Sequence, residues 1–95
     1  MPKTYIRPTT TIEAYATYRL GRKVTVEEAA TSLGLSRTQY WNRRSEEKIG
    51  ADHVLRAAHY FGLNPVQALV EMGCIPLATL RECVAAWDAE WDAED

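Results

Sequence analysis

The chain has 95 residues, of which 46% are hydrophobic and 25% are charged. This length and composition predict one small globular domain with an appended element, and they exclude disorder of the whole chain. There is no run of about 18 apolar residues, so no transmembrane helix is expected. The first residues lack the apolar core of a signal peptide.

The net charge of −2 conceals an uneven distribution of charge along the chain. The last ten residues hold five of the thirteen acidic side chains and none of the eleven basic ones. Residues 1–85 therefore carry eleven basic against eight acidic groups, or +3. A mildly basic body with an acidic end is compatible with nucleic-acid binding, whereas the overall sum alone would argue weakly against it.

Residues 1–9 are expected to form a flexible arm. From Thr10 onwards, sequence signals for the start and the end of a helix alternate along the chain. Capping boxes, in which a hydroxyl accepts from the N3 amide and the N3 side chain binds the cap amide, are predicted at Thr10–Glu13, Thr25–Glu28 and Ser36–Gln39. Asn64 before Pro65 predicts a fourth start. Glycines that favour the left-handed conformation supply the stops, at Gly21, Gly34, Gly62 and Gly73.

Five short helices and a longer sixth one follow from these signals. We expect them at about 11–20, 26–33, 37–45, 51–61 and 65–72, and from Pro76 to about Trp91. No alternating strand pattern occurs, so the fold class is all-α. Apolar stripes at helical spacing predict the core from Ile12, Tyr15, Ala16 and Leu20, from Ala29, Ala30 and Leu33, from Val54, Leu55, Ala58 and Phe61, and from Val66, Leu69 and Val70.

The second and third helices have the spacing of a helix-turn-helix. Two helices that meet at a steep angle need a small residue at their contact, which Ala30 supplies, and a residue that tolerates positive φ in the turn, which Gly34 supplies. Leu33 and Leu35 are expected to fill the angle between the helices, and Tyr40 to point back into it. The cap at Ser36 leaves Arg37 and Thr38 on the leading turn, where side chains of a recognition helix meet base edges.

The stretch "VEEAATSLGLSRTQYWNRR", followed by "ADHVLRAAHYFGLNPVQALVEMG", resembles the phage repressor/Cro-type helix-turn-helix family. The resemblance covers residues 11–73 and implies a five-helix DNA-binding domain, residues 10–74, with the recognition helix at 37–45. The function that it implies is a sequence-specific transcriptional regulator, a repressor or Cro-like protein of phage or prophage type. Its partner would be a double-stranded DNA operator, in the cytoplasm and associated with the nucleoid.

The resemblance also implies which residues contact DNA. Arg37, Thr38 and Asn42 match the family's base-contacting positions, and Arg and Asn pair well with guanine and adenine. Phosphate contacts are expected from Arg22, Lys23 and Thr25 before the second helix and from Arg43, Arg44, Ser45 and Lys48 at and after the end of the third.

Three positions depart from the family pattern, and they surround a tryptophan. Val26 stands where a polar residue is common, Arg43 where an apolar one is usual, and Arg44 where Glu is common. Trp41 is kept among the base-contact candidates, through an apolar contact to a thymine methyl or sugar. Packing against the helix 51–61 and a protein–protein contact remain alternatives for Trp41. Arg43 would extend its stem over the core and deliver its charge to phosphate.

The last segment, residues 75–95, carries an apolar seam on a helix with an acidic tail. The seam recurs at spacings of 3, 4, 3 and 4 in Leu77, Leu80, Val84, Trp87 and Trp91. This pattern predicts a short a/d face, too short for a free coiled coil but suited to a partner. Three interpretations stay open: the seam folds back on its own domain, mediates a homodimer, or binds another protein.

The sequence offers no catalytic constellation. His53 and His59 share no face with carboxylates, and no nucleophile–base pair, paired carboxylates or Gly-rich phosphate loop occurs. Cys74 and Cys83 lack His or Cys neighbours at metal-ligand spacing, which favours reduced thiols. We expect no enzyme activity, metal, cofactor or small-molecule ligand. The alternative function is a protein-interaction regulator on the same scaffold: an antirepressor, a recombination accessory factor or a DNA-binding antitoxin.

Overall fold

The computed structural model describes residues 10–93, and its secondary-structure elements over them are all helices, which confirms the all-α expectation. The helices are α1 (Ile12–Leu20), α2 (Val26–Ser32), α3 (Arg37–Ser45), α4 (Ala51–Phe61), α5 (Pro65–Glu71) and α6 (Leu77–Ala93). The predicted arm, residues 1–9, and the acidic end, residues 94–95, lie outside the described residues. Within the described part, no helix has the length and hydropathy needed to span a bilayer.

Most helix starts form as the sequence predicts. Ser36 Oγ accepts from the backbone N–H of Gln39 at 3.1 Å, and the Ser36 N–H donates to the Gln39 side chain at 2.9 Å. The same reciprocal pair closes the box of Thr25 and Glu28, and Asn64 caps α5 with Pro65 at its first position. Since each cap satisfies backbone donors that a helix leaves unpaired, these starts are set by local sequence.

The first predicted start is wrong by one residue. The N-cap of α1 is Thr11, whose hydroxyl accepts from the Ala14 N–H at 3.2 Å, and no capping box forms between Thr10 and Glu13. The carboxylate of Glu13 instead binds two side chains of α3. A tertiary contact therefore overrides a local capping preference at this position.

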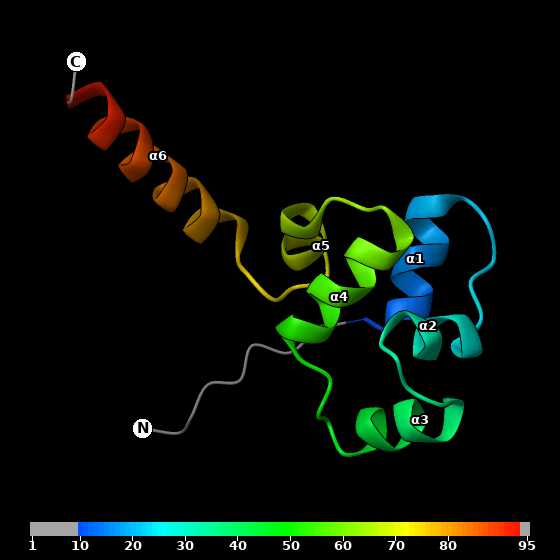
Figure 1. The fold of residues 1–95 in the computed structure, drawn as a ribbon. Helices are drawn as coiled ribbons and strands as arrows, with labels where there is room; N and C mark the ends of the chain where they lie inside the picture. Colours follow the sequence, from blue (N-terminus) through cyan, green and yellow to red (C-terminus); the bar gives the residue numbers. More distant parts are fainter. Residues whose placement is uncertain (1–9, 94–95) are drawn as a thin grey trace.

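Helices α1, α2, α4 and α5 enclose a single core, and α3 lies against its lower end in Figure 1. The core includes Ile12, Tyr15, Ala29, Ala30, Leu33, Tyr40, Val54, Ala57, Ala58, Ala68, Met72 and Cys74. Two predicted core residues are exposed instead: Leu55 at 43% and Val66 at 47%. The buried stripe of α4 follows Val54, Ala57 and Ala58, so Leu55 lies outside it on the helix surface.

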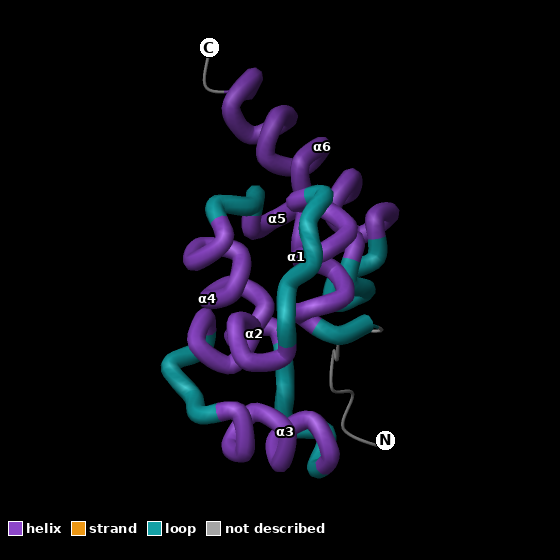
Figure 2. Tube along the Cα trace, turned by 90° about the vertical axis from the view of Figure 1, so that its right-hand side faces the viewer, coloured by secondary structure: helices purple, strands orange, loops and turns teal. Residues whose placement is uncertain are grey.

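Helix α6 projects away from this bundle. Figures 1 and 2 both show it at the end of the molecule opposite α3, with the chain leaving the bundle after α5. The radius of gyration is 15.6 Å, against about 12 Å for a compact domain of this length. The residues of α6 are exposed almost throughout, so its seam does not fold back on the domain.

A pair of neighbouring substitutions in α4 tests this assignment of the core. Val54 is 1% exposed, so Val54→Ala should lower the free energy of unfolding by about 2 kcal/mol through lost burial and a residual cavity. Leu55→Ala, the matched control, should change it by no more than about 0.5 kcal/mol. Urea unfolding followed by circular dichroism measures both, and equal losses would contradict the assignment.

Candidate nucleic-acid interface

A tight turn joins α2 to α3 and sets the direction of the second helix. Gly34 adopts φ 70°, a left-handed conformation that L side chains rarely take, and its N–H donates to the Thr31 carbonyl at 3.0 Å. The Leu35 N–H then donates to the Ala30 carbonyl at 3.0 Å. Ala30 and Leu33 are buried at this corner, as predicted. The chain is thus turned sharply before Ser36 starts α3.

Tyr40 anchors α3 to the rest of the domain. Its side chain is 0% exposed, and its hydroxyl donates to Glu13 Oε1 on α1 at 2.6 Å. Arg44, one turn further along α3, donates to the other carboxylate oxygen of Glu13 at 2.5 Å. Burial, and then the bond to Glu13, raise the pKa of the Tyr40 hydroxyl well above its ordinary value of 10.0. We call Glu13, Tyr40 and Arg44 the Glu13 network.

Sequence analysis missed Glu13 as part of the site. The residue lies 27 positions before Tyr40 and 31 before Arg44, so no local pattern links it to them. Its only sequence signal is an acidic side chain in the first turn of α1, which local rules assign to capping. The structure brings it to α3 because the N-terminal end of α1 lies beside the α2–α3 corner (Figure 1).

Arg44 also lies over two aromatic rings of its own helix. The Arg44 guanidinium lies over the Tyr40 ring at 5.5 Å and over the Trp41 ring at 4.9 Å. Arg44, predicted to grip phosphate, is thus engaged inside the protein by a carboxylate and two aromatic faces. Trp41 is 53% exposed, and its described ring contact is with Arg44 on its own helix.

The face of α3 opposite Tyr40 carries two of the predicted base-contacting residues, Thr38 and Asn42, and the predicted phosphate contact Ser45. They are spaced by four and three residues, so they form one stripe pointing away from buried Tyr40. All are exposed, and no hydrogen bond joins their side chains to another described residue. Arg37 and Arg43 flank this stripe, exposed and without an acidic partner among the residues that the structure describes.

The other predicted phosphate contacts fall into three groups. Arg22 pairs with Glu28 at 3.1 Å and Lys48 with Glu46 at 3.2 Å, both at the surface. Exposed pairs of this kind contribute little and exchange readily for another anion. Lys23 is exposed without an acidic partner in the described part of the chain. The Thr25 hydroxyl accepts from the Glu28 N–H as the cap of α2.

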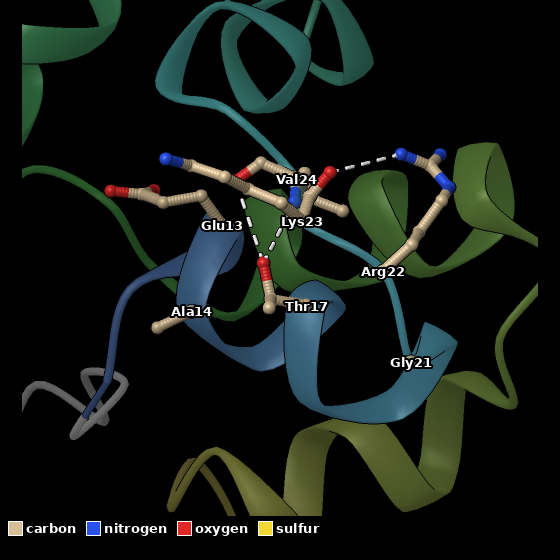
Figure 3. A pocket seen from close by; sticks show the side chains of 7 residues that line it. All are labelled: Glu13, Ala14, Thr17, Gly21, Arg22, Lys23 and Val24. Atoms are coloured by element: carbon tan, nitrogen blue, oxygen red, sulfur yellow. Dashed lines mark hydrogen bonds between the residues drawn. The ribbon is translucent and has the colours of Figure 1, made fainter.

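The segment that carries Arg22 and Lys23 is tied to α1. Figure 3 shows the Thr17 hydroxyl directed at Val24, from whose N–H it accepts a hydrogen bond at 2.8 Å. The Arg22 guanidinium donates a hydrogen bond to the carbonyl of the next residue, Lys23, at 3.3 Å. Lys23 and Val24, which line the pocket in Figure 3, also line a second open hollow of about 470 Å³ to which Thr25, Glu27 and Arg37 contribute. The segment before α2 and the start of α3 therefore meet at one concave edge.

No protein-family model, curated protein or solved structure matches this chain. Among the described residues, no group of three or more His, Cys, Asp or Glu side chains could hold a metal ion.

Alkaline pH is expected to weaken the fold through Tyr40. Because its pKa is raised in the folded state, its contribution is complete below pH 10.0 and is lost as the pH rises towards the folded pKa. Tyr40→Phe keeps the ring, so the free energy of unfolding should fall less steeply above pH 10.0. It should also be about 1 kcal/mol lower at neutral pH, from the lost hydrogen bond.

Urea titrations at a series of pH values measure these slopes. Tyr60→Phe, which removes the hydroxyl of an exposed ring outside the Glu13 network, is the control for the loss of a tyrosine hydroxyl. A remaining slope in Tyr40→Phe is expected from Tyr15, since burial and its bond to Glu71 raise the pKa of Tyr15 to about 12. Identical slopes for Tyr40→Phe and the parent would show that the Glu13 network does not hold the Tyr40 proton.

Proposed function

We propose that this chain is a sequence-specific double-stranded DNA-binding regulator, with residues 10–74 forming a repressor-type helix-turn-helix domain. The observation that carries the proposal is the exposed polar stripe of Thr38, Asn42 and Ser45 on α3, opposite the buried anchor Tyr40. An α-helix fits the major groove, where side chains read a distinct pattern of donors and acceptors for each base pair. A rigidly seated helix with free polar side chains meets that requirement.

The proposed base contacts are made by Arg37, Thr38 and Asn42. A guanidinium pairs bidentately with guanine and a carboxamide with adenine, each discriminating by about 1–3 kcal/mol. Arg37 opens α3, and the leading turn of a recognition helix approaches the bases. Trp41, on an adjacent face of the same helix, is placed to contact a thymine methyl or a sugar.

The proposed phosphate contacts divide according to the partners that each cation already has. Lys23 and Arg43, which have no acidic partner among the described residues, contact phosphate directly. Arg22 and Lys48 would exchange their surface carboxylates for phosphate, while Thr25 and Ser45 add polar contacts. Arg44 stays in the Glu13 network and acts by holding α3 in position.

Regulation would be through occlusion of a promoter, as a repressor or Cro-like protein. A two-fold dimer would read half-sites about 34–36 Å apart, or a multiple of that distance. The resemblance to phage repressors supports a phage or prophage regulator acting in the cytoplasm on the nucleoid. No cofactor or small-molecule ligand enters this mechanism.

Selection from a pool of randomised DNA duplexes tests the proposal directly. The full chain should enrich one motif, arranged as an inverted repeat with half-sites about 10 base pairs apart or a multiple. Affinity for that motif should fall steeply with salt because phosphate contacts release counterions. A pool that stays random at low salt would overturn the proposal. It would favour the protein-interaction alternative, which the exposed apolar face of α6 also supports.

Substitutions on α3 and before α2 should separate base reading from phosphate binding. Arg37→Ala should weaken binding to the selected motif by about 1–3 kcal/mol and relax the preference at one base pair. Lys23→Ala and Arg43→Ala should weaken binding to selected and random DNA alike, and each should reduce the salt slope by about 1.

Arg19→Ala is the matched control for these losses of charge. Arg19 lies in the last turn of α1, at the end of that helix away from α3 (Figure 1). Fluorescence anisotropy on labelled duplexes measures all four variants against the parent. If Arg19→Ala weakened binding as much as Arg37→Ala, the effect would be one of net charge and the assignment of α3 would fail.

A further inference from the structure

Helix α6 presents a continuous apolar face that no other described element covers. Leu77, Val84, Trp87 and Trp91 are exposed, with the two indoles at 58% and 70%, and Leu80 is half-buried. Figure 1 shows the helix extending away from the bundle. A row of large apolar side chains on a projecting helix marks an interaction surface.

We propose that α6 binds α6 of a second copy of this chain in an antiparallel pair, with Val84 opposite the partner's Trp87. The proposal goes beyond DNA binding and does not depend on it. In heptad terms, Leu77, Val84 and Trp91 occupy a positions, and Leu80 and Trp87 occupy d positions. Antiparallel helices pack each a residue against a d residue of the partner, which fixes the register once one layer is chosen.

The sizes of the seam residues favour this arrangement. With Val84 opposite the partner's Trp87, Leu80 lies opposite the partner's Trp91, and the two-fold axis repeats both layers. Every one of these layers then holds one indole and one aliphatic side chain, so their volumes are nearly equal. A parallel, in-register pair would instead stack indole on indole and valine on valine, leaving layers of very different width. Even packing without voids is the condition for a stable apolar seam.

The charges beside the seam favour the same arrangement. Arg81 and Asp88 occupy e positions seven residues apart, and neither has an ion pair among the described residues. In the antiparallel register, each Arg81 faces the partner's Asp88, on both sides of the two-fold axis. A parallel pair would set Asp88 beside the partner's Cys83. It would also bring together the C-terminal turns of both helices, which carry Asp88, Glu90 and Asp92. Like charges side by side destabilise such a pair.

The length of the seam predicts a weak, concentration-dependent dimer. Helix α6 has 17 residues, or about 25 Å of helix, which gives two heptads of contact. Isolated coiled coils of this length are marginal. The dimer therefore depends on both indoles, and Trp87→Ala should abolish it without unfolding the domain, because α6 lies outside the core.

Exchanging the charges at positions 81 and 88 in the full chain tests the proposed antiparallel register of α6. Arg81→Glu and Asp88→Arg should each weaken the dimer about tenfold in sedimentation equilibrium, since each replaces attraction with repulsion. The double variant should regain the parent affinity to within about threefold, because the pairs re-form with opposite sign. Glu82→Arg, at an outward position between the seam residues, is the control and should leave the affinity unchanged. A double variant no better than the single ones, or a parent that stays monomeric, would overturn the proposal.

Spin labels on α6 test the orientation separately. In a Cys83→Ser background, labels at Thr79→Cys and Ala86→Cys occupy the same heptad position one heptad apart, and buried Cys74 does not react. In the antiparallel pair, the two copies of the label are offset along the axis by about 19 Å at position 79 and about 2 Å at position 86. The measured distance should therefore be clearly longer at position 79. Equal distances would mean a parallel pair, and the absence of dipolar coupling would mean that α6 does not pair, so either result would overturn the proposal.

Discussion

The carboxylate of Glu13 is the interaction on which the orientation of α3 depends. It accepts from the buried Tyr40 hydroxyl through one oxygen and from Arg44 through the other, so a single side chain of α1 holds two successive turns of α3. Carboxylate and guanidinium are both largely removed from water, with side-chain exposures of 15% and 26%. Charges in such places are stable only when paired, since removing one partner leaves the other desolvated without compensation. Because Glu13 holds one side of α3 against α1, the polar stripe on the opposite side of α3 faces outwards.

The helices could be predicted because residues close in the chain determine where each helix begins and ends. A capping hydroxyl with Glu or Gln three residues later, or a glycine after an apolar stripe, satisfies backbone groups that are close in the chain. The capping-box prediction was wrong at Glu13, because its carboxylate accepts from Tyr40 and Arg44 of α3 instead of from a backbone N–H at the start of α1. Burial was harder to predict at Leu55 and Val66, since apolar character alone does not say which side of a short helix meets the core.

The candidate interface shows a similar division between local and tertiary information. Periodicity alone places Thr38, Asn42 and Ser45 opposite Tyr40 once α3 is recognised as a helix. It does not reveal which of the arginines and lysines already have carboxylate partners. Arg44, Arg22 and Lys48 looked alike in the sequence, yet Arg44 alone pairs with a carboxylate from a different part of the fold. Arg44, which was predicted to contact phosphate and instead binds Glu13, lies over the ring of Trp41. Trp41 and its neighbours are also the positions that depart from the repressor-family pattern.

The arrangement of α3 and α6 removes an apparent conflict between an acidic chain and a DNA-binding proposal. The molecule is 52 Å long, and Figures 1 and 2 place α6 at the end away from α3. At physiological ionic strength, exposed charges are screened over about 8 Å. Asp88 and Glu90 on the projecting helix would therefore exert little repulsion on DNA bound at α3 as proposed. Such DNA would meet the local charge of Lys23, Arg37 and Arg43, which outnumber the nearby exposed Glu27. Antiparallel pairing of α6 would keep this separation, because the acidic residues would lie along the helix pair while each α3 stays on its own domain.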